Sequence, residues 1–153
     1  MSLFLFIGDW VELNGIEYMV HGITSSLQKT YEEALAHCKN DGGKLAEPKS
    51  AEGNNDIATL ASNSLSGSST GVWGVWIGID DKSQEGDFRY ASDNTAITYT
   101  DWDTAQPDNY NYNGNLDEDC VRLVNWPQTN RFKWVDGLCS LKQPFVCERI
   151  QGK

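Results

Sequence analysis

The chain has 153 residues, 39% of them hydrophobic, which suits one domain with its own core and argues against disorder by composition. Its formal net charge is −10, and a charge of this sign repels the phosphates of a nucleic acid. No apolar run reaches the length of about eighteen residues that a membrane span needs. We therefore expect neither a nucleic-acid partner nor a membrane span.

The first part of the chain predicts a hairpin followed by two helices. Residues 3–7 are apolar and short, and they predict a buried edge strand; residues 11–20 alternate around Asn14-Gly15, a strong hairpin signal. Thr30 and Glu33 form a capping box for a helix that ends at Gly42-Gly43. Ser50 caps a second helix that runs through Ala61.

The second part predicts short strands around a long polar loop. Residues 62–71 are rich in Ser and Gly and predict a surface loop, and residues 100–118 form a second, longer loop. Strands are expected at 73–79, 88–90, 120–124, 131–134 and 144–147. Helices followed by strands in this order indicate an α+β domain.

The cysteines indicate disulfides and an oxidising compartment. There are four, and none forms a Cys-x-x-Cys pair: Cys38, Cys120, Cys139 and Cys147. Four cysteines allow three pairings, and the spacing does not choose among them. Only two histidines occur, so a zinc site has little support from the sequence.

The loop before Cys120 concentrates oxygen-bearing side chains. It holds six acids (Asp101, Asp103, Asp108, Asp117, Glu118, Asp119) and five amides (Gln106, Asn109, Asn111, Asn113, Asn115), with no Lys or Arg among them. Carboxylate and amide oxygens together suit Ca²⁺ before Zn²⁺ or Mg²⁺. The spacing is not that of an EF-hand, and composition alone also allows a solvated acidic loop.

Six short motifs in a fixed order resemble the C-type lectin family. They are Trp76-Ile77-Gly78-Ile79, Glu85 to Tyr90, Tyr99 to Trp102, Gln106-Pro107-Asp108, Glu118 to Val121, and Trp134-Val135-Asp136. The resemblance covers residues 18–149, with residues 1–17 as an N-terminal extension, and it implies a single domain over 1–153. The implied fold has two helices flanking small antiparallel sheets and a long calcium-binding loop region.

The resemblance also implies how the cysteines and the loop are arranged. It pairs Cys38 with Cys147 and Cys120 with Cys139. It implies a cis peptide between Gln106 and Pro107, which is an informative expectation because only about 5–6% of X-Pro bonds are cis.

By similarity, a sugar-binding Ca²⁺ takes Gln106, Asp108, Glu118 and Asp136, and two sugar hydroxyls complete its shell. The Gln-Pro-Asp order resembles galactose-type members, whereas Glu-Pro-Asn marks mannose-type ones. Tyr110 matches the aromatic side chain on which galactose packs its apolar face in relatives. A second Ca²⁺ site maps onto Asp81, Glu85, Asn109, Glu118 and Asp119.

One position departs from the family pattern. Val135 stands where the family has an Asn that supplies a metal oxygen and an N–H donor, and losing a hydrogen bond costs about 0.5–1.5 kcal/mol. The main prediction is a secreted, extracellular lectin that binds galactose-containing glycans through Ca²⁺ and can form homo-oligomers. The alternative is a lectin-like domain that no longer binds sugar and recognises a protein or another surface. The sequence offers no catalytic constellation, so an enzyme is not expected.

Overall fold

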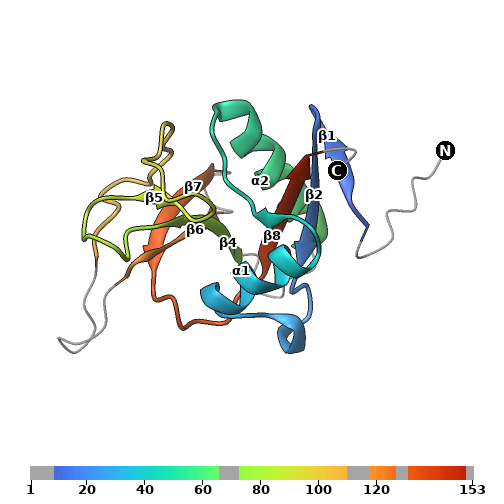
Figure 1. Cartoon of the computed structure of the whole chain (residues 1–153), viewed down its shortest axis with the longest axis horizontal. Helices are drawn as coiled ribbons and strands as arrows, with labels where there is room; N and C mark the ends of the chain where they lie inside the picture. Colours follow the sequence, from blue (N-terminus) through green and yellow to red (C-terminus); the bar gives the residue numbers. More distant parts are fainter. Residues whose placement is uncertain (1–8, 66–72, 110–117, 127–130, 151–153) are drawn as a thin grey trace.

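The computed structural model describes residues 9–65, 73–109, 118–126 and 131–150. Within these residues, two α-helices and eight strands follow one another (Figure 1). They are β1 (Val11–Leu13), β2 (Ile16–His21), α1 (Tyr31–Asn40), β3 (Lys44–Leu45), α2 (Ala51–Leu65), β4 (Trp73–Asp80), β5 (Arg89–Tyr90), β6 (Cys120–Trp126), β7 (Arg131–Gly137) and β8 (Phe145–Ile150), with a short 3-10 helix at Ser25–Leu27. The strand predicted at residues 3–7 lies outside the described residues.

The N-terminal hairpin is confirmed, and its turn explains the sequence that encodes it. β1 and β2 are antiparallel, with Leu13 opposite Ile16. Asn14 has a φ of 56° and Gly15 a φ of 88°. Two consecutive positive φ values match the twist of antiparallel strands and favour Asn-Gly at the tip.

Both predicted helix starts are confirmed, whereas the end of the second helix is later than predicted. The Thr30 hydroxyl accepts from the Glu33 N–H and the Glu33 carboxylate accepts from the Thr30 N–H, at 3.3 and 2.9 Å. The Ser50 hydroxyl accepts from the Gly53 N–H at 3.1 Å. The predicted loop at 62–71 was wrong in its first residues, because α2 continues to Leu65, which is buried in the core. Tertiary packing here outweighs the weak helix preference of Ser and Asn.

The strands form two antiparallel groups joined by a single parallel pair. The order along the sheet is β1-β2-β8-β4-β6-β7, with β3 on β8 and β5 on β4. Among the strand pairs of the described residues, only the pair of β8 and β4, where Phe145 is opposite Trp76, is parallel. The predicted small antiparallel sheets are therefore the two halves of one mixed sheet.

The two helices cover opposite faces of this sheet. Successive strand residues point to opposite faces, and β4 shows the alternation: Val75, Ile77 and Ile79 join the core cluster that contains the α2 side chains, whereas Trp76 joins the cluster that contains α1. All four of these β4 side chains are completely buried. The sheet is thus packed on both sides, which fixes β6 and β7 as a rigid base for the loops that follow.

Two disulfides close the fold in the pairing that the family resemblance implies. Cys38 of α1 bonds to Cys147 of β8, 109 residues apart, and Cys120 of β6 bonds to Cys139, 19 residues apart. Chain-entropy estimates for such loops are about 3–5 kcal/mol each. No cysteine is free. Within the described residues, no helix is long and apolar enough to cross a membrane.

Candidate functional site

The loop from Asp101 to Asn109 is attached to β7 by backbone hydrogen bonds. The Trp134 N–H donates to the Asp101 carbonyl and the Asp103 N–H donates to the Trp134 carbonyl, both at 2.9 Å. The Gln106 N–H then donates to the Asp103 carbonyl at 3.0 Å, closing a turn. These bonds place residues 106–109 close to Asp136, two residues beyond Trp134 on the same strand.

Asp101 is one of the six clustered acids, but its carboxylate is held by structural partners. Oδ1 accepts from the Lys133 ammonium at 2.7 Å, and Oδ2 accepts from the Asn54 amide at 3.0 Å. Asn54 in turn accepts from the Trp134 indole N–H at 2.8 Å. Asp101 therefore joins the loop to α2 and to the core.

The Gln106–Pro107 peptide is cis, as the family resemblance implies. The Gln106 amide nitrogen donates to Asp108 Oδ2 at 3.2 Å. The Gln106 Oε1 is buried and has no hydrogen-bond partner among the described residues. A buried acceptor without a donor is costly, and an oxygen in that state is suited to coordinate a cation.

Asp136 fixes the end of this loop. Its side chain is buried, with 2% of the residue exposed, and its two oxygens accept the backbone N–H groups of Asp108 and Asn109 at 3.1 and 2.7 Å. Burial raises the pKa of Asp136, and the charge of Asp108 raises it further, while the two backbone hydrogen bonds act in the opposite direction. Without a positively charged partner, the buried carboxylate of Asp136 therefore binds a proton more readily than an exposed carboxylate does.

A group of three carboxylates forms around this position. Asp108, Glu118 and Asp136 each offer an oxygen, and these oxygens lie within 4.8 Å of one another. Together with the buried Gln106 oxygen they form a set of oxygen donors only, which is the donor type that a hard cation prefers.

A second carboxylate group lies at the end of β4. Oxygens of Asp81, Glu85 and Asp119 come within 4.8 Å of one another. The Asp81 N–H donates to the Asp119 carbonyl at 3.0 Å, and Asp81 Oδ2 accepts from the Gly86 N–H at 2.8 Å. Asp81 Oδ1 is buried and has no partner among the described residues. Burial raises the pKa of Asp81 to about 7, with the charges of Glu85 and Asp119 adding to the increase.

Asn109 is hydrogen-bonded to two residues of the first carboxylate group. Its Oδ1 accepts from the Glu118 N–H at 3.1 Å, while its own N–H donates to Asp136. A carbonyl oxygen has two lone pairs, so this hydrogen bond leaves one lone pair for a cation. Its φ of 44° is positive, a conformation that Asn tolerates better than most residues.

Val135 is buried and lies opposite Arg122 in the ladder between β6 and β7. Asn125, an amide residue on the neighbouring strand β6, lies opposite Phe132. Three residues along a strand correspond to about 10 Å, so Asn125 does not replace the amide that the family has at position 135. Asn130 and Tyr110 lie outside the described residues, as do residues 111–117.

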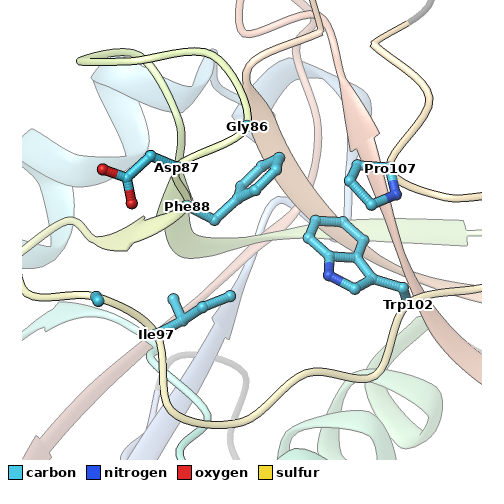
Figure 2. Close-up of a pocket in the computed structure, with 7 residues that line it drawn as sticks. Gly86, Asp87, Phe88, Ile97, Trp102 and Pro107 are labelled. Carbon is cyan, nitrogen blue, oxygen red and sulfur yellow. The ribbon is translucent and has the colours of Figure 1, made fainter.

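A hollow with apolar walls adjoins the cis proline. Its volume is about 410 Å³, and Figure 2 shows the rings of Phe88, Trp102 and Pro107 around it, with the Asp87 carboxylate pointing away from Trp102. Phe88 packs edge-to-face on Trp102, with ring centroids 4.8 Å apart. Phe88 and Trp102 belong to two different sequence motifs, and the sequence does not show that they lie on one surface.

The structure also joins two side chains that the sequence left unconnected. His21 at the end of β2 and His37 on α1 have ring centroids 4.5 Å apart, and both lie close to Asp41. Sixteen residues separate the histidines, and no motif links them. This cluster belongs to a different part of the molecule from the loop site.

Comparisons with known proteins identify the family. The chain is 37% identical over 143 residues to an alpha-N-acetylgalactosamine-specific lectin of Patiria pectinifera, covering 91% of this chain and 77% of that one. It is 36% identical over 121 residues to collectin-11 of Danio rerio, covering 79% of this chain and 39% of the collectin, so it spans about two fifths of that relative.

The fold agrees with solved structures of the same family. The trimeric structure of the Kupffer cell C-type lectin receptor Clec4f has a TM-score of 0.72 and 26% identity, with 95% of this chain and 85% of that chain covered. These relatives are lectins and collectins rather than enzymes. The Lectin C-type domain profile matches residues 27–149, and the chain therefore belongs to the C-type lectin family.

Proposed function

We propose that this protein is a calcium-dependent lectin that recognises terminal galactose or N-acetylgalactosamine. The observation that carries the proposal is the group of three carboxylates at Asp108, Glu118 and Asp136, with a buried Gln106 oxygen that has no hydrogen-bond partner among the described residues. Family membership supports carbohydrate binding in general. The metal and the sugar class are the specific parts of the proposal.

Four side chains are proposed to hold the sugar-binding Ca²⁺: Gln106, Asp108, Glu118 and Asp136. They are oxygen donors, and three carry negative charge, so a divalent cation would relieve the repulsion among them. When bound, Ca²⁺ supplies coordination positions for two neighbouring hydroxyls of a sugar. The protein's part is to hold these oxygens in place, and the two backbone hydrogen bonds that the Asp136 carboxylate accepts already fix the loop that carries Asp108.

The same side chains are proposed to read the sugar. The carboxylates of Asp108, Glu118 and Asp136 accept protons from sugar hydroxyls, and the Gln106 amide donates to a hydroxyl oxygen. Tyr110 is proposed as the aromatic platform for the apolar face of galactose. The alpha-N-acetylgalactosamine-specific lectin among the relatives supports this sugar class.

The second carboxylate group is proposed as a second Ca²⁺ site, formed by Asp81, Glu85, Asn109, Glu118 and Asp119. Asp81 Oδ1 is buried without a hydrogen-bond partner among the described residues and the pKa of Asp81 is raised, and both observations support this assignment because a cation would supply the missing positive partner.

Val135 lowers the number of protein donors at the sugar-binding site. Its buried aliphatic side chain brings no oxygen to a cation and no N–H to a sugar. We expect water to fill that coordination position and the affinity for both Ca²⁺ and sugar to be lower than in a site with an amide there. The alternative is that this chain is a lectin-like domain that does not bind sugar and recognises a protein or another surface. The galactose-retention experiment below separates the two proposals.

The remaining proposals concern context. Two disulfides with no free cysteine support an extracellular location. Galactose-containing glycans are the proposed partners, and the trimeric relative supports a homo-oligomer, in which weak individual sites gain avidity.

The test is retention on immobilised galactose with Ca²⁺ and with a chelator. We expect retention in Ca²⁺ and release by the chelator, and elution by free galactose but not by free mannose. Retention under both conditions, or under neither, contradicts the calcium-dependent mechanism. Variant Asp9→Asn, which removes one exposed charge at the start of the described chain, is the matched control for variants at the site.

A further inference from the structure

The cluster of His21, His37 and Asp41 lies apart from the proposed calcium sites and has a different donor chemistry. β2 and α1, which carry it, are at the centre and right of Figure 1, whereas β5 and β7 are at the left. His21 is the last residue of β2, and Asp41 caps the C-terminus of α1 four residues after His37. Residues four apart on a helix share one face, so His37 and Asp41 point to the same side.

The three side chains converge on one point. The Nε2 atoms of His37 and His21 lie 3.2 and 3.7 Å from the same oxygen, Asp41 Oδ2. For zinc with bonds of about 2.0–2.1 Å and tetrahedral angles, two ligand atoms are separated by about 3.3–3.4 Å. The two observed separations lie on either side of this value, so small rotations of the rings bring all three atoms to coordination distance.

The His21 nitrogen supplies a separate observation. Its Nε2 is buried and has no hydrogen-bond partner among the described residues, and the 3.7 Å to Asp41 is longer than a hydrogen bond. Most buried polar atoms in folded proteins have a hydrogen-bond partner, and the described residues provide none for this nitrogen. A metal ion between the three side chains would provide it.

The rings are held in place from behind by Phe145. His21 stacks on the Phe145 ring with centroids 5.0 Å apart and an interplanar angle of 19°, and His37 contacts the same ring edge-on at 5.3 Å. Phe145 is completely buried next to Cys147, whose disulfide to Cys38 fixes the position of α1 against β8. The site therefore lies where a disulfide and a buried ring join α1 to β8.

We propose that His21, His37 and Asp41 form a binding site for a divalent transition metal, with Zn²⁺ as the expected ion. Imidazole nitrogens select Zn²⁺ and similar ions over Ca²⁺, which prefers oxygen only. The Asp41 side chain is 37% exposed, so water can complete a tetrahedral shell from that side. The bound ion links β2 to the end of α1 and leaves the loop from Asp101 to Asn109 unchanged.

The test uses the full chain without an affinity tag, in an excess of Ca²⁺ so that the carboxylate groups are occupied. Because the chain has only two histidines, both imidazole NMR signals report on this cluster alone. Titration with Zn²⁺ is expected to shift both signals and to saturate at one Zn²⁺ per chain. Unchanged imidazole signals overturn the proposal, whether or not zinc binds elsewhere, because they leave the cluster as a hydrogen-bonded His–Asp group.

Variants provide the second measurement. His37→Gln and Asp41→Asn are expected to weaken Zn²⁺ binding by at least roughly tenfold, whereas Asp9→Asn is expected to leave it unchanged. Undiminished Zn²⁺ affinity in both cluster variants contradicts the proposal. Far-UV circular dichroism serves as the folding control, because His37→Gln should keep the wild-type spectrum.

Discussion

Asp136 Oδ2 accepts the backbone N–H of Asn109 at 2.7 Å, and this hydrogen bond joins β7 to the end of the loop from Asp101 to Asn109. The other oxygen of the same carboxylate accepts from the Asp108 N–H at 3.1 Å. A single buried side chain thus determines where the loop ends and also belongs to the proposed calcium ligands. Loop conformation and cation binding are coupled through it.

Asp136→Asn tests this coupling. The amide keeps one acceptor for the loop N–H groups, but it removes a negative charge from the calcium ligands, and its NH₂ group faces a backbone donor. We expect loss of galactose retention at Ca²⁺ concentrations that saturate the wild type, with far-UV circular dichroism unchanged. Asp9→Asn should bind as the wild type does. Full retention in Asp136→Asn would remove this residue from the proposed site.

The sugar preference is expected to follow the order of amide and acid in the loop. The double variant Gln106→Glu with Asp108→Asn exchanges the two functions across the cis proline, while the number of charges stays the same. We expect its preference to move from galactose towards mannose in competitive elution. An unaltered ranking of the two sugars in a folded, calcium-binding double variant would show that the loop does not read the sugar.

Asp81 predicts how stability without metal depends on pH. Its pKa is raised from 3.8 to about 7, so the folded chain holds a proton that the unfolded chain releases. The stabilisation of the folded chain by this bound proton is fully present below pH 3.8 and is lost as the pH rises through about 7.

Asp81→Asn should remove that dependence. Asn can donate to Asp119 and accept from the Gly86 N–H at any pH, as the protonated acid does. With a chelator at about pH 8 we expect a Tm above that of the wild type, by about 2–4 °C for each kcal/mol gained. Added Ca²⁺ should raise the Tm less than in the wild type. A Tm equal to or below the wild-type value without metal would contradict the proposal that an ionised, buried Asp81 destabilises the folded chain.

Asp101 is expected to be a structural residue. Asp101→Ala leaves the Lys133 ammonium and the Asn54 amide without their acceptor, and we expect a loss of about 1–3 kcal/mol in the free energy of unfolding. Urea denaturation measures this loss, with Asp9→Ala as the control. A denaturation midpoint equal to that of the control would show that the contacts contribute nothing. Some galactose retention should persist in Asp101→Ala, because the calcium ligands remain.

Acid should release the bound sugar. Protons compete with a cation for carboxylates, and burial raises the pKa of Asp136, so the competition begins above the ordinary range of an Asp. Retention on galactose in Ca²⁺ is therefore expected to fall as the pH decreases and to be lost at about pH 4. Full retention at that pH would argue against carboxylates as the cation ligands.

Local features of the fold could be predicted from the sequence. The Asn14-Gly15 turn and the Thr30–Glu33 capping box each involve residues at most three positions apart, and both are confirmed. The disulfide pairing required the family resemblance, because spacing alone leaves three choices. The end of α2 depends on burial of Leu65 in a core that the local sequence does not reveal.

The types of residue in the candidate site could be predicted from the sequence. Which acids join the three-carboxylate group and which pair with other side chains could not. Asp101 and Asp108 are seven positions apart in one acidic loop, yet Asp101 pairs with Lys133 of β7 while Asp108 turns to Asp136. That distinction depends on the register of the loop on β7. The histidine cluster was missed for the same reason, because its geometry arises only when β2 and α1 pack on Phe145.

The pairing of β2 with β8 has a consequence for how the domain can be displayed. Val11 of β1 lies opposite Tyr18 of β2, and Tyr18 lies opposite Glu148 of β8, so the first and last described strands flank β2, on the side away from β5 and β7 (Figure 1). A tether attached at this edge would leave the loop from Asp101 to Asn109 away from the point of attachment. If the proposed galactose site is correct, copies joined there would bind a surface dense in galactose through several weak sites at once.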